Sequence, residues 1–102
     1  MELRDKLKEL TDEELFAAYQ KEKQLEIKQE LTLRYLYLAK SIAIEMNKLY
    51  SHFMQVDDVV NEGAIAIMKG IDRFDPDKGI KFSTFISRRI RGMIFDLVRE
   101  KD

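Results

Sequence analysis

The chain has 102 residues, of which 45% are hydrophobic and 36% are charged, and this balance indicates one folded domain and excludes a disordered chain. It contains no Cys, which excludes disulfides and thiolate metal sites, and no apolar run approaches the roughly 20 residues that span a bilayer. The formal net charge of -1 argues against a generic tight binder of nucleic acid. The lack of Cys fits a cytoplasmic protein, and Met1-Glu2-Leu3-Arg4 is not an apolar segment of signal-peptide type.

Residues 1–24 are expected to form an N-terminal helical segment. Thr11-Asp12-Glu13-Glu14 predicts a capping box, in which the Thr11 hydroxyl accepts from the Glu14 amide and the Glu14 carboxylate accepts from the Thr11 amide. A short amphipathic helix should then run to about Lys23, and its buried face should consist of Leu15, Phe16 and Tyr19.

Residues 25–102 are expected to form the main domain, which begins with one long helix over residues 25–50. Apolar residues recur there at three- and four-residue steps, the spacing of a buried stripe: Ile27, Leu31, Tyr35, Leu38, Ile42, Met46 and Leu49. Tyr37, Ala39 and Ala43 widen this stripe, which indicates that the helix packs against more than one neighbour. Residues 51–55 should form a loop.

Two further helices are predicted after that loop. Asp57 is predicted to cap a helix over residues 58–74, whose apolar face consists of Val60, Ala64, Ile67, Met68, Ile71 and Phe74. Residues 75–79, Asp-Pro-Asp-Lys-Gly, have the chemistry of a turn. Ser83 is predicted to cap the last helix, with Ile86, Ile90, Met93, Ile94 and Leu97 facing inward.

The whole pattern predicts an all-α fold, a compact bundle of about four helices with one long central helix. The last helical pattern continues to Asp102 without a Gly or Pro stop signal. We therefore expect a domain cut from a longer chain.

Catalysis is the function that the sequence argues against most strongly. His52 is the only histidine, so neither a Cys/His pair nor a usual zinc site can form. The four glycines are scattered singly, which excludes a phosphate-cradling loop. We therefore expect no catalytic residue, no metal and no cofactor.

Three glycines stand inside predicted helices, where each costs roughly 1 kcal/mol relative to Ala. Close packing of a neighbouring helix is the expected reason for Gly63 and Gly70. Gly92 follows a basic cluster, where the missing side chain would admit a nucleic-acid backbone.

The C-terminal quarter of the chain is basic and interleaves cations with aromatic rings and hydroxyl groups. Residues 78–102 carry seven Lys/Arg and three Asp/Glu, whereas acids outnumber bases before them, so two kinds of partner are expected. In residues 81–91 the cations suit phosphates and the rings suit unpaired bases, at about 1–3 kcal/mol for each stacked base. A second interpretation stays open, in which Phe82 and Phe85 belong to the core at helical spacing.

Two adjacent motifs resemble segments of bacterial RNA polymerase sigma factors of the sigma-70 family. Residues 58–75, which begin Asp58-Val59-Val60-Asn61-Glu62-Gly63, resemble the polymerase-binding segment. Residues 79–92, with Lys81-Phe82-Ser83-Thr84-Phe85, resemble the melting and promoter-recognition segment, and residues 33–40 resemble the segment that precedes both. The resemblance covers about residues 25–102 and implies the helical region 2 domain.

Within this family the sequence Arg88-Arg89-Ile90-Arg91-Gly92 is similar to the flagellar and sporulation-type alternative factors. Housekeeping members have two tryptophans where this chain has Arg88 and Arg89. Ile80 replaces an aromatic residue common in those members, and Phe85 stands where Tyr is usual.

The resemblance implies core RNA polymerase as one partner, bound through the clamp coiled coil of its largest catalytic subunit. The contacts carried over are Asp58, Asn61, Glu62 and Met68. Helical spacing puts positions 58, 61 and 62 on one face. The alternative, a solvated helix N-terminus whose dipole favours acids, accounts for Asp58 and leaves Asn61 unexplained.

Promoter DNA is the other implied partner: the family recognises and melts the -10 element and captures flipped bases of the non-template strand. Phe82 and Phe85 would line or support the base pocket, with Ser83 and Thr84 between them. Phosphates and base edges would be held by Lys81, Arg88, Arg89 and Arg91. An anti-sigma factor is a further candidate partner, and no membrane is expected.

Two other functions stay open. One is a stand-alone split-sigma subunit or a regulator that occupies the polymerase clamp. The other is a helical protein-interaction module that never touches DNA, in which Arg88→Ala and Arg91→Ala would leave promoter opening unchanged.

Overall fold

The computed structural model describes residues 2–50 and 55–101. The helices are α1 (Leu3–Lys8), α2 (Asp12–Lys21), α3 (Leu25–Tyr50), α4 (Val56–Arg73), the 3-10 turn η1 (Pro76–Lys78) and α5 (Phe82–Lys101). The predicted all-α fold with a long central helix is confirmed, and the described ranges contain no strand. Residues 51–54, which include His52, lie outside the described residues, as does Asp102.

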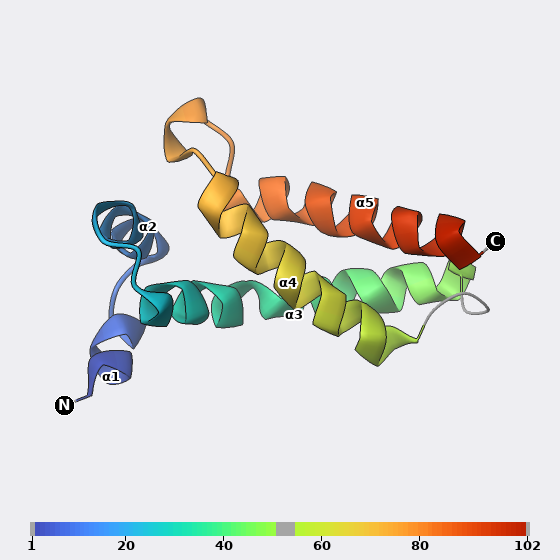
Figure 1. Ribbon diagram of the computed structural model, residues 1–102, viewed down its shortest axis with the longest axis horizontal. Coiled ribbons are helices and arrows are strands. Elements are labelled where there is room, and N and C mark those ends of the chain that lie inside the picture. Colours follow the sequence, from blue (N-terminus) through green and yellow to red (C-terminus); the bar gives the residue numbers. More distant parts are fainter. Residues whose placement is uncertain (1, 51–54, 102) are drawn as a thin grey trace.

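The long helix α3 is the base on which the other α-helices pack (Figure 1). The helices α4 and α5 lie along one side of α3, while α1 and α2 lie at its N-terminal end. Within the described ranges, no helix is both long and apolar enough to cross a membrane.

Two local sequence signals are confirmed in detail. The Glu14 amide donates to the Thr11 hydroxyl at 3.1 Å, and the Thr11 amide donates to Glu14 Oε1 at 2.9 Å, which completes the capping box of α2. In the turn before α5, the Asp77 amide donates to the Asp75 carboxylate at 2.9 Å. Gly79 closes that turn with φ of 76°, a left-handed conformation that glycine adopts without strain.

The two predicted caps of the later helices are wrong. Gln55 is the N-cap of α4, so Asp57 and Asp58 lie in its first turn, where the helix dipole favours carboxylates. The last helix begins at Phe82, one residue before the predicted cap Ser83, because burial of the Phe82 ring draws that residue into the bundle.

The buried face of α3 is confirmed, with Leu38 only partly buried, except at two positions that are exposed. Tyr37 is 57% exposed because it lies two residues, about 200° of helical rotation, from the buried Tyr35. Leu49 is 76% exposed because it lies in the last turn of α3, where the described part of the chain provides no covering neighbour.

Two glycines allow α4 to approach its neighbours closely, as predicted. A Cβ atom on Gly63 would lie 2.8 Å from Cβ of Ala39 on α3, and one on Gly70 would lie 2.5 Å from Cδ1 of Ile86 on α5. Gly92 differs, because a Cβ atom there would meet nothing within 4 Å.

Gly63→Ala should destabilise the fold by about 1–3 kcal/mol, because the added methyl group would press on Ala39, whose Cβ cannot rotate away. Gly92→Ala is the matched control and should stabilise by up to about 1 kcal/mol, since it adds helix propensity in open space. Urea unfolding followed by circular dichroism measures both. Equal effects at the two positions would contradict the close contact between α3 and α4.

Candidate functional site

The first candidate surface is the polar face of α4. Asp58, Asn61 and Glu62 are all exposed and lie together on one side of its first two turns, while Ile67 on the opposite side is fully buried. Ile65 adds an exposed apolar group to the same face, at 47% exposure. This arrangement provides carboxylates and an amide around an apolar centre, which suits a protein partner with cations and apolar groups.

Met68, the fourth predicted residue of this surface, lies two turns beyond Asn61 and is half-buried. It lines a groove together with Leu7 of α1 and Leu33 of α3. The structure therefore brings three of the four residues into one patch and places Met68 at its edge.

The second candidate surface is the N-terminal half of α5 with the residue before it. Lys81, Thr84, Arg88 and Gly92 are exposed and follow one another at three- and four-residue steps, so they form one outward track. Such a track offers cations to a phosphate chain, and the open space at Gly92 leaves room for a backbone.

The two other predicted cations have partners. The Arg89 guanidinium lies over the Phe85 ring, 5.6 Å from its centroid, and its Nε is buried with no hydrogen-bond partner among the described residues. Arg91 donates to Glu45 of α3 across 3.1 Å, in an exposed ion pair. Lys81 and Arg88 are thus the more available cations. Arg91 would have to release the Glu45 carboxylate before it could bind a phosphate.

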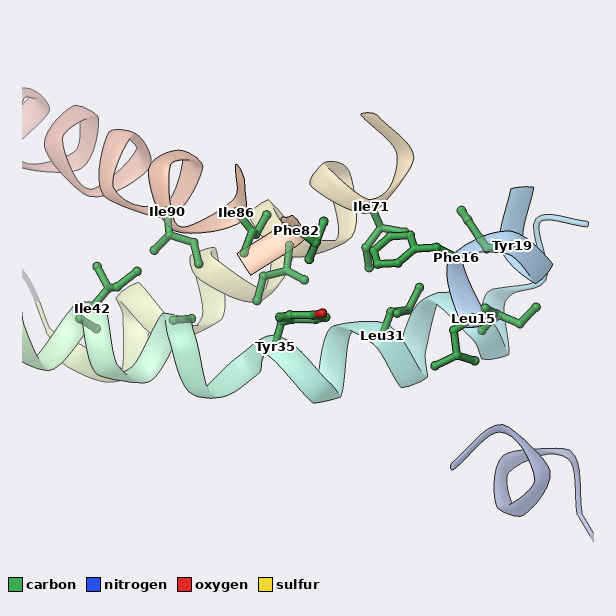
Figure 2. Close-up of a cluster of buried hydrophobic side chains, with 14 of the residues drawn as sticks. Leu15, Phe16, Tyr19, Leu31, Tyr35, Ile42, Ile71, Phe82, Ile86 and Ile90 are labelled. Atoms are coloured by element: carbon green, nitrogen blue, oxygen red, sulfur yellow. The ribbon is translucent and has the colours of Figure 1, made fainter. Parts of the chain in front are cut away.

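Phe82 lies at the centre of an aromatic cluster and not on the surface. Its ring is 5% exposed, and its centroid lies 5.0 Å from Phe16 of α2, 4.8 Å from Tyr35 of α3 and 5.1 Å from Phe74. Figure 2 shows the rings of Phe16, Tyr35 and Phe82 pointing into the same space. Phe85 is half-buried beside Phe74, with 5.5 Å between centroids. The two interpretations of these rings are therefore compatible, since the rings of Phe82 and Phe85 pack in or against the core and also lie beside the basic track.

A groove of about 530 Å³ opens over this aromatic cluster, within the size range of ligand sites. Aromatic and apolar side chains line part of it, and polar groups surround them. The lining consists of Asp12, Glu13, Phe16, Ala17, Gln20, Tyr35, Phe74, Pro76, Asp77, Ile80, Lys81, Phe82 and Ser83. An aromatic floor with hydrogen-bonding groups at the rim suits a planar polar ring.

The N-terminal segment supplies one wall of this groove, which the sequence interpretation did not foresee. Phe16 and Gln20 come from α2, and Asp12 joins that helix to α3. The capping box and the apolar face of α2 are both recognisable in the sequence and indicate a helix that docks on the domain, but they do not indicate which surface it reaches.

Arg34 fixes this docking. Its guanidinium donates to Asp12 at 2.8 Å, to Glu30 at 2.8 Å, and to the backbone carbonyl oxygens of Leu7 and Lys8 at 3.1 and 3.2 Å. These carbonyls lie in the last turn of α1, and the Leu7 oxygen also accepts from the Leu10 amide at 3.1 Å. One side chain of α3 therefore holds both N-terminal helices.

Asp12 and Tyr35 share a short hydrogen bond at the edge of the groove, in which the hydroxyl donates to Asp12 Oδ2. Burial opposes ionisation of Asp12, but the hydrogen bonds from Tyr35 and Arg34 outweigh it and lower the pKa of that carboxyl. Burial, and then the bond to Asp12, raise the pKa of Tyr35 above its ordinary value. Both groups therefore keep this donor and acceptor arrangement at neutral pH.

A second network joins α2, α3 and α4. Lys28 donates to Asp72 at 2.5 Å, and the Tyr19 hydroxyl donates to the other carboxylate oxygen at 2.7 Å. The hydrogen bonds from Lys28 and Tyr19 lower the pKa of Asp72. This network holds the buried face of α2, to which Tyr19 belongs, against the domain.

The family model described as Sigma-70 region 2 matches residues 31–102. A search of the solved structures gave no significant match.

Several curated relatives are sigma factors by name. RNA polymerase sigma factor FliA of Salmonella typhimurium is 31% identical over 75 residues, which cover 74% of this chain and 31% of that protein. The FliA protein of Pseudomonas aeruginosa is 32% identical over 84 residues, or 82% of this chain and 34% of that protein. RNA polymerase sigma-D factor of Bacillus subtilis is 39% identical over 46 residues, or 45% of this chain and 18% of that protein. The chain thus spans about a third of the length of the FliA proteins that it matches.

Stability should fall as the pH is lowered through about 4 and below, because Asp12 and Asp72 have lowered pKa values in the folded chain. Their hydrogen bonds contribute fully above the pKa of an unfolded aspartate and are lost as each carboxyl is protonated in the folded state. Urea unfolding at a series of pH values measures this.

Asp72→Asn should lower stability at neutral pH and flatten its acid dependence. Asp5→Asn, which removes an exposed aspartate outside both networks, is the control and should follow the wild type. An unchanged acid dependence in Asp72→Asn would show that its bonds to Lys28 and Tyr19 do not stabilise the fold.

Proposed function

The chain belongs to the sigma-70 family through its region 2 domain, and from this premise we propose that it binds core RNA polymerase and recognises and melts the promoter -10 element at transcription initiation. The observation that carries the proposal is the placement of two unlike surfaces on adjoining helices, a polar face on α4 and a basic track on α5 beside an aromatic groove. Its site of action, with polymerase on DNA, would be the bacterial cytoplasm.

Polymerase binding is assigned to the polar face of α4. Asp58, Asn61 and Glu62 are exposed, and neither carboxylate forms an ion pair within the described ranges, so both are free for cations of a partner. Ile65 and the half-buried Met68 add apolar contact area. The proposed partner surface is the clamp coiled coil of the largest catalytic subunit, whose helices would pack along α4.

Promoter melting is assigned to the groove and the basic track. Lys81 and Arg88 would hold phosphates of the non-template strand along the outer side of α5, with Thr84 between them. A base flipped out of the duplex would enter the groove over Phe82, next to the Ser83 hydroxyl. Extrusion of a base costs a few kcal/mol, which stacking and hydrogen bonds in the groove would offset.

The acidic rim of the groove is a reason to expect weak DNA binding by the isolated chain. Asp12, Glu13 and Asp77 line the same groove as Lys81, and the net charge of the chain is -1. Carboxylates near a phosphate chain oppose its binding, whereas they accept hydrogen bonds from amino groups of a base. We therefore assign much of the electrostatic attraction for DNA to polymerase, and selection of the melted strand to this domain.

Glu62→Lys should abolish binding to an isolated clamp coiled-coil fragment, because the new cation would face the cations that the carboxylate is proposed to bind. Isothermal titration calorimetry with the folded chain measures this. Glu100→Lys makes the same charge change on an exposed part of α5 and is the control. Saturable binding by the control and the wild type, with loss in Glu62→Lys, is the expected result. No binding by folded wild type would overturn the polymerase assignment.

Lys81→Ala and Arg88→Ala should each weaken binding of a single-stranded -10 oligonucleotide by about tenfold and reduce its salt slope by about one. The oligonucleotide is selected from a random pool with the wild-type chain bound to core polymerase, and binding is measured by fluorescence anisotropy of that complex. Arg99→Ala is the control, since Arg99 lies nearer the C-terminal end of the same helix and is paired with Asp96.

The same measurement separates the proposal from its alternatives. Unchanged binding in Lys81→Ala and Arg88→Ala, with intact clamp binding, would favour a clamp-binding regulator without DNA contact. Submicromolar binding of duplex promoter DNA by the chain without polymerase would contradict the proposal that polymerase supplies much of the electrostatic attraction for DNA.

A further inference from the structure

One surface of the long helix is used neither by the core nor by the proposed function. We define the outer stripe of α3 as the exposed residues at three- and four-residue steps within residues 33–48: Leu33, Tyr37, Lys40, Ile44 and Lys48. Leu33 is 65% exposed, Tyr37 57% and Ile44 56%. Single exposed apolar residues are ordinary, but three large ones aligned on one helix face form a patch of the kind that marks an interface.

Apart from Leu33, which borders α1 and α4, the outer stripe lies on the side of α3 opposite its buried face. Ile42 is 3% exposed and lies about 160° around the helix from Ile44, and Leu31 and Tyr35 are buried on the same inner side. The polar face of α4 and the basic track of α5 belong to helices that pack on that inner side. A partner of the outer stripe would therefore leave both proposed binding surfaces free over most of their length.

The charge of the outer stripe is positive, in a chain whose net charge is -1. Lys40 and Lys48 are exposed and have no ion pair with the side chains that the structure describes. The only exposed acid of α3 between them, Glu45, is engaged by Arg91 of α5 at 3.1 Å. The two lysines therefore lack an internal counter-charge, and an acidic partner would supply it.

A groove extends the stripe at its N-terminal end. It measures about 370 Å³ and is lined by Leu7 of α1, Met68 of α4 and Leu33 of the stripe itself, together with polar side chains. An apolar side chain of a partner that lies along the stripe would fit into this hollow beside Leu33.

From these observations we propose that the outer stripe of α3 binds an acidic amphipathic helix of a regulatory protein. Leu33 and Ile44 are eleven residues apart, about 16 Å along the axis, which matches about three turns of a partner helix. Leucines of that helix would pack on Leu33, Tyr37 and Ile44, and carboxylates beside them would pair with Lys40 and Lys48. Because Met68 lines both this groove and the edge of the α4 face, the end of such a helix would compete with the clamp only there.

An anionic lipid surface and a second copy of this chain are weaker fits to the same stripe. A membrane-binding helix presents a broad apolar face rimmed by many cations, whereas this stripe is one residue wide and holds two lysines. A second copy would bring its own lysines to the stripe and no unpaired acid between positions 40 and 48. The acidic helix satisfies both the apolar and the charged groups.

The test uses two synthetic helical peptides of about 18 residues, each with one face of leucines. In the first peptide glutamates flank the leucines, and in the second lysines take their place. Calorimetry with the full chain should show the acidic peptide binding at least about tenfold more tightly than the basic one. Lys40→Glu/Lys48→Glu should reverse this preference, because the same leucine face then meets carboxylates on α3.

Tyr37→Ser/Ile44→Ser should lose both peptides, and Leu25→Ser should bind like the wild type. Leu25 is the matched control, since it is 56% exposed on the same helix and lies off the stripe. Equal binding of both peptides, or binding that survives Tyr37→Ser/Ile44→Ser, overturns the proposal. Preferential binding to vesicles that contain anionic lipids also overturns it. The same holds for a dimer, seen by sedimentation, that dissociates when the stripe residues are replaced. None of these measurements involves polymerase or DNA, so their failure leaves the proposed function standing.

Discussion

The burial of Phe82 is the constraint on which the arrangement of this domain depends. Its ring contacts rings from three other parts of the chain, at centroid distances of 5.0 Å for Phe16, 4.8 Å for Tyr35 and 5.1 Å for Phe74. Offset and edge-on contacts of this kind contribute about 0.5–1.5 kcal/mol each beyond the area that they bury. Because α5 begins at Phe82, these contacts also fix where the basic track starts.

Because Phe82 is packed in the core, it also fixes the positions of the surface residues beside it. Lys81 precedes Phe82 and Ser83 follows it, so both polar side chains stand at the edge of the groove whose floor the ring helps to form. The position of α5 along α4 is further restricted at Gly70, where a methyl group would collide with Ile86. Packing at the two sites holds the cations of α5 in a fixed position relative to the polar face of α4. Such a fixed position requires a close-packed interior, because loosely packed side chains would let the helices shift.

Much of this fold could be predicted because its signals are local. The bounds of α3, the capping box at Thr11 and the turn at Gly79 each follow from residues within a few positions of one another. The close approach at Gly63 was predicted from the cost of glycine in a helix, although the sequence did not identify Ala39 as the neighbour.

The errors arise where tertiary contacts decide. Val59, and not the predicted Val60, is the fully buried valine of α4, because it lies one turn before Gly63 on the side of the helix that contacts α3. The hydrogen bond from Arg34 to Asp12 joins residues 22 positions apart, and the hydrophobic periodicity of the sequence cannot predict such a contact. The wall that α2 gives to the groove depends on that bond, so this part of the candidate site was out of reach of pattern alone.

If Arg91 binds DNA as proposed, its pairing with a carboxylate of the same chain must be weak enough to be exchanged. Its pair with Glu45 is 42% exposed on the arginine side and 61% on the glutamate side. Exposed pairs contribute only about 0–1 kcal/mol, since water competes for both charges. A phosphate chain, which releases counterions as it binds, offers Arg91 more than a single solvated carboxylate does. The pair would therefore orient the guanidinium beside α3 in the free chain and yield it when melted DNA is present, which ties the weak internal electrostatics of this fold to the external partners proposed for it.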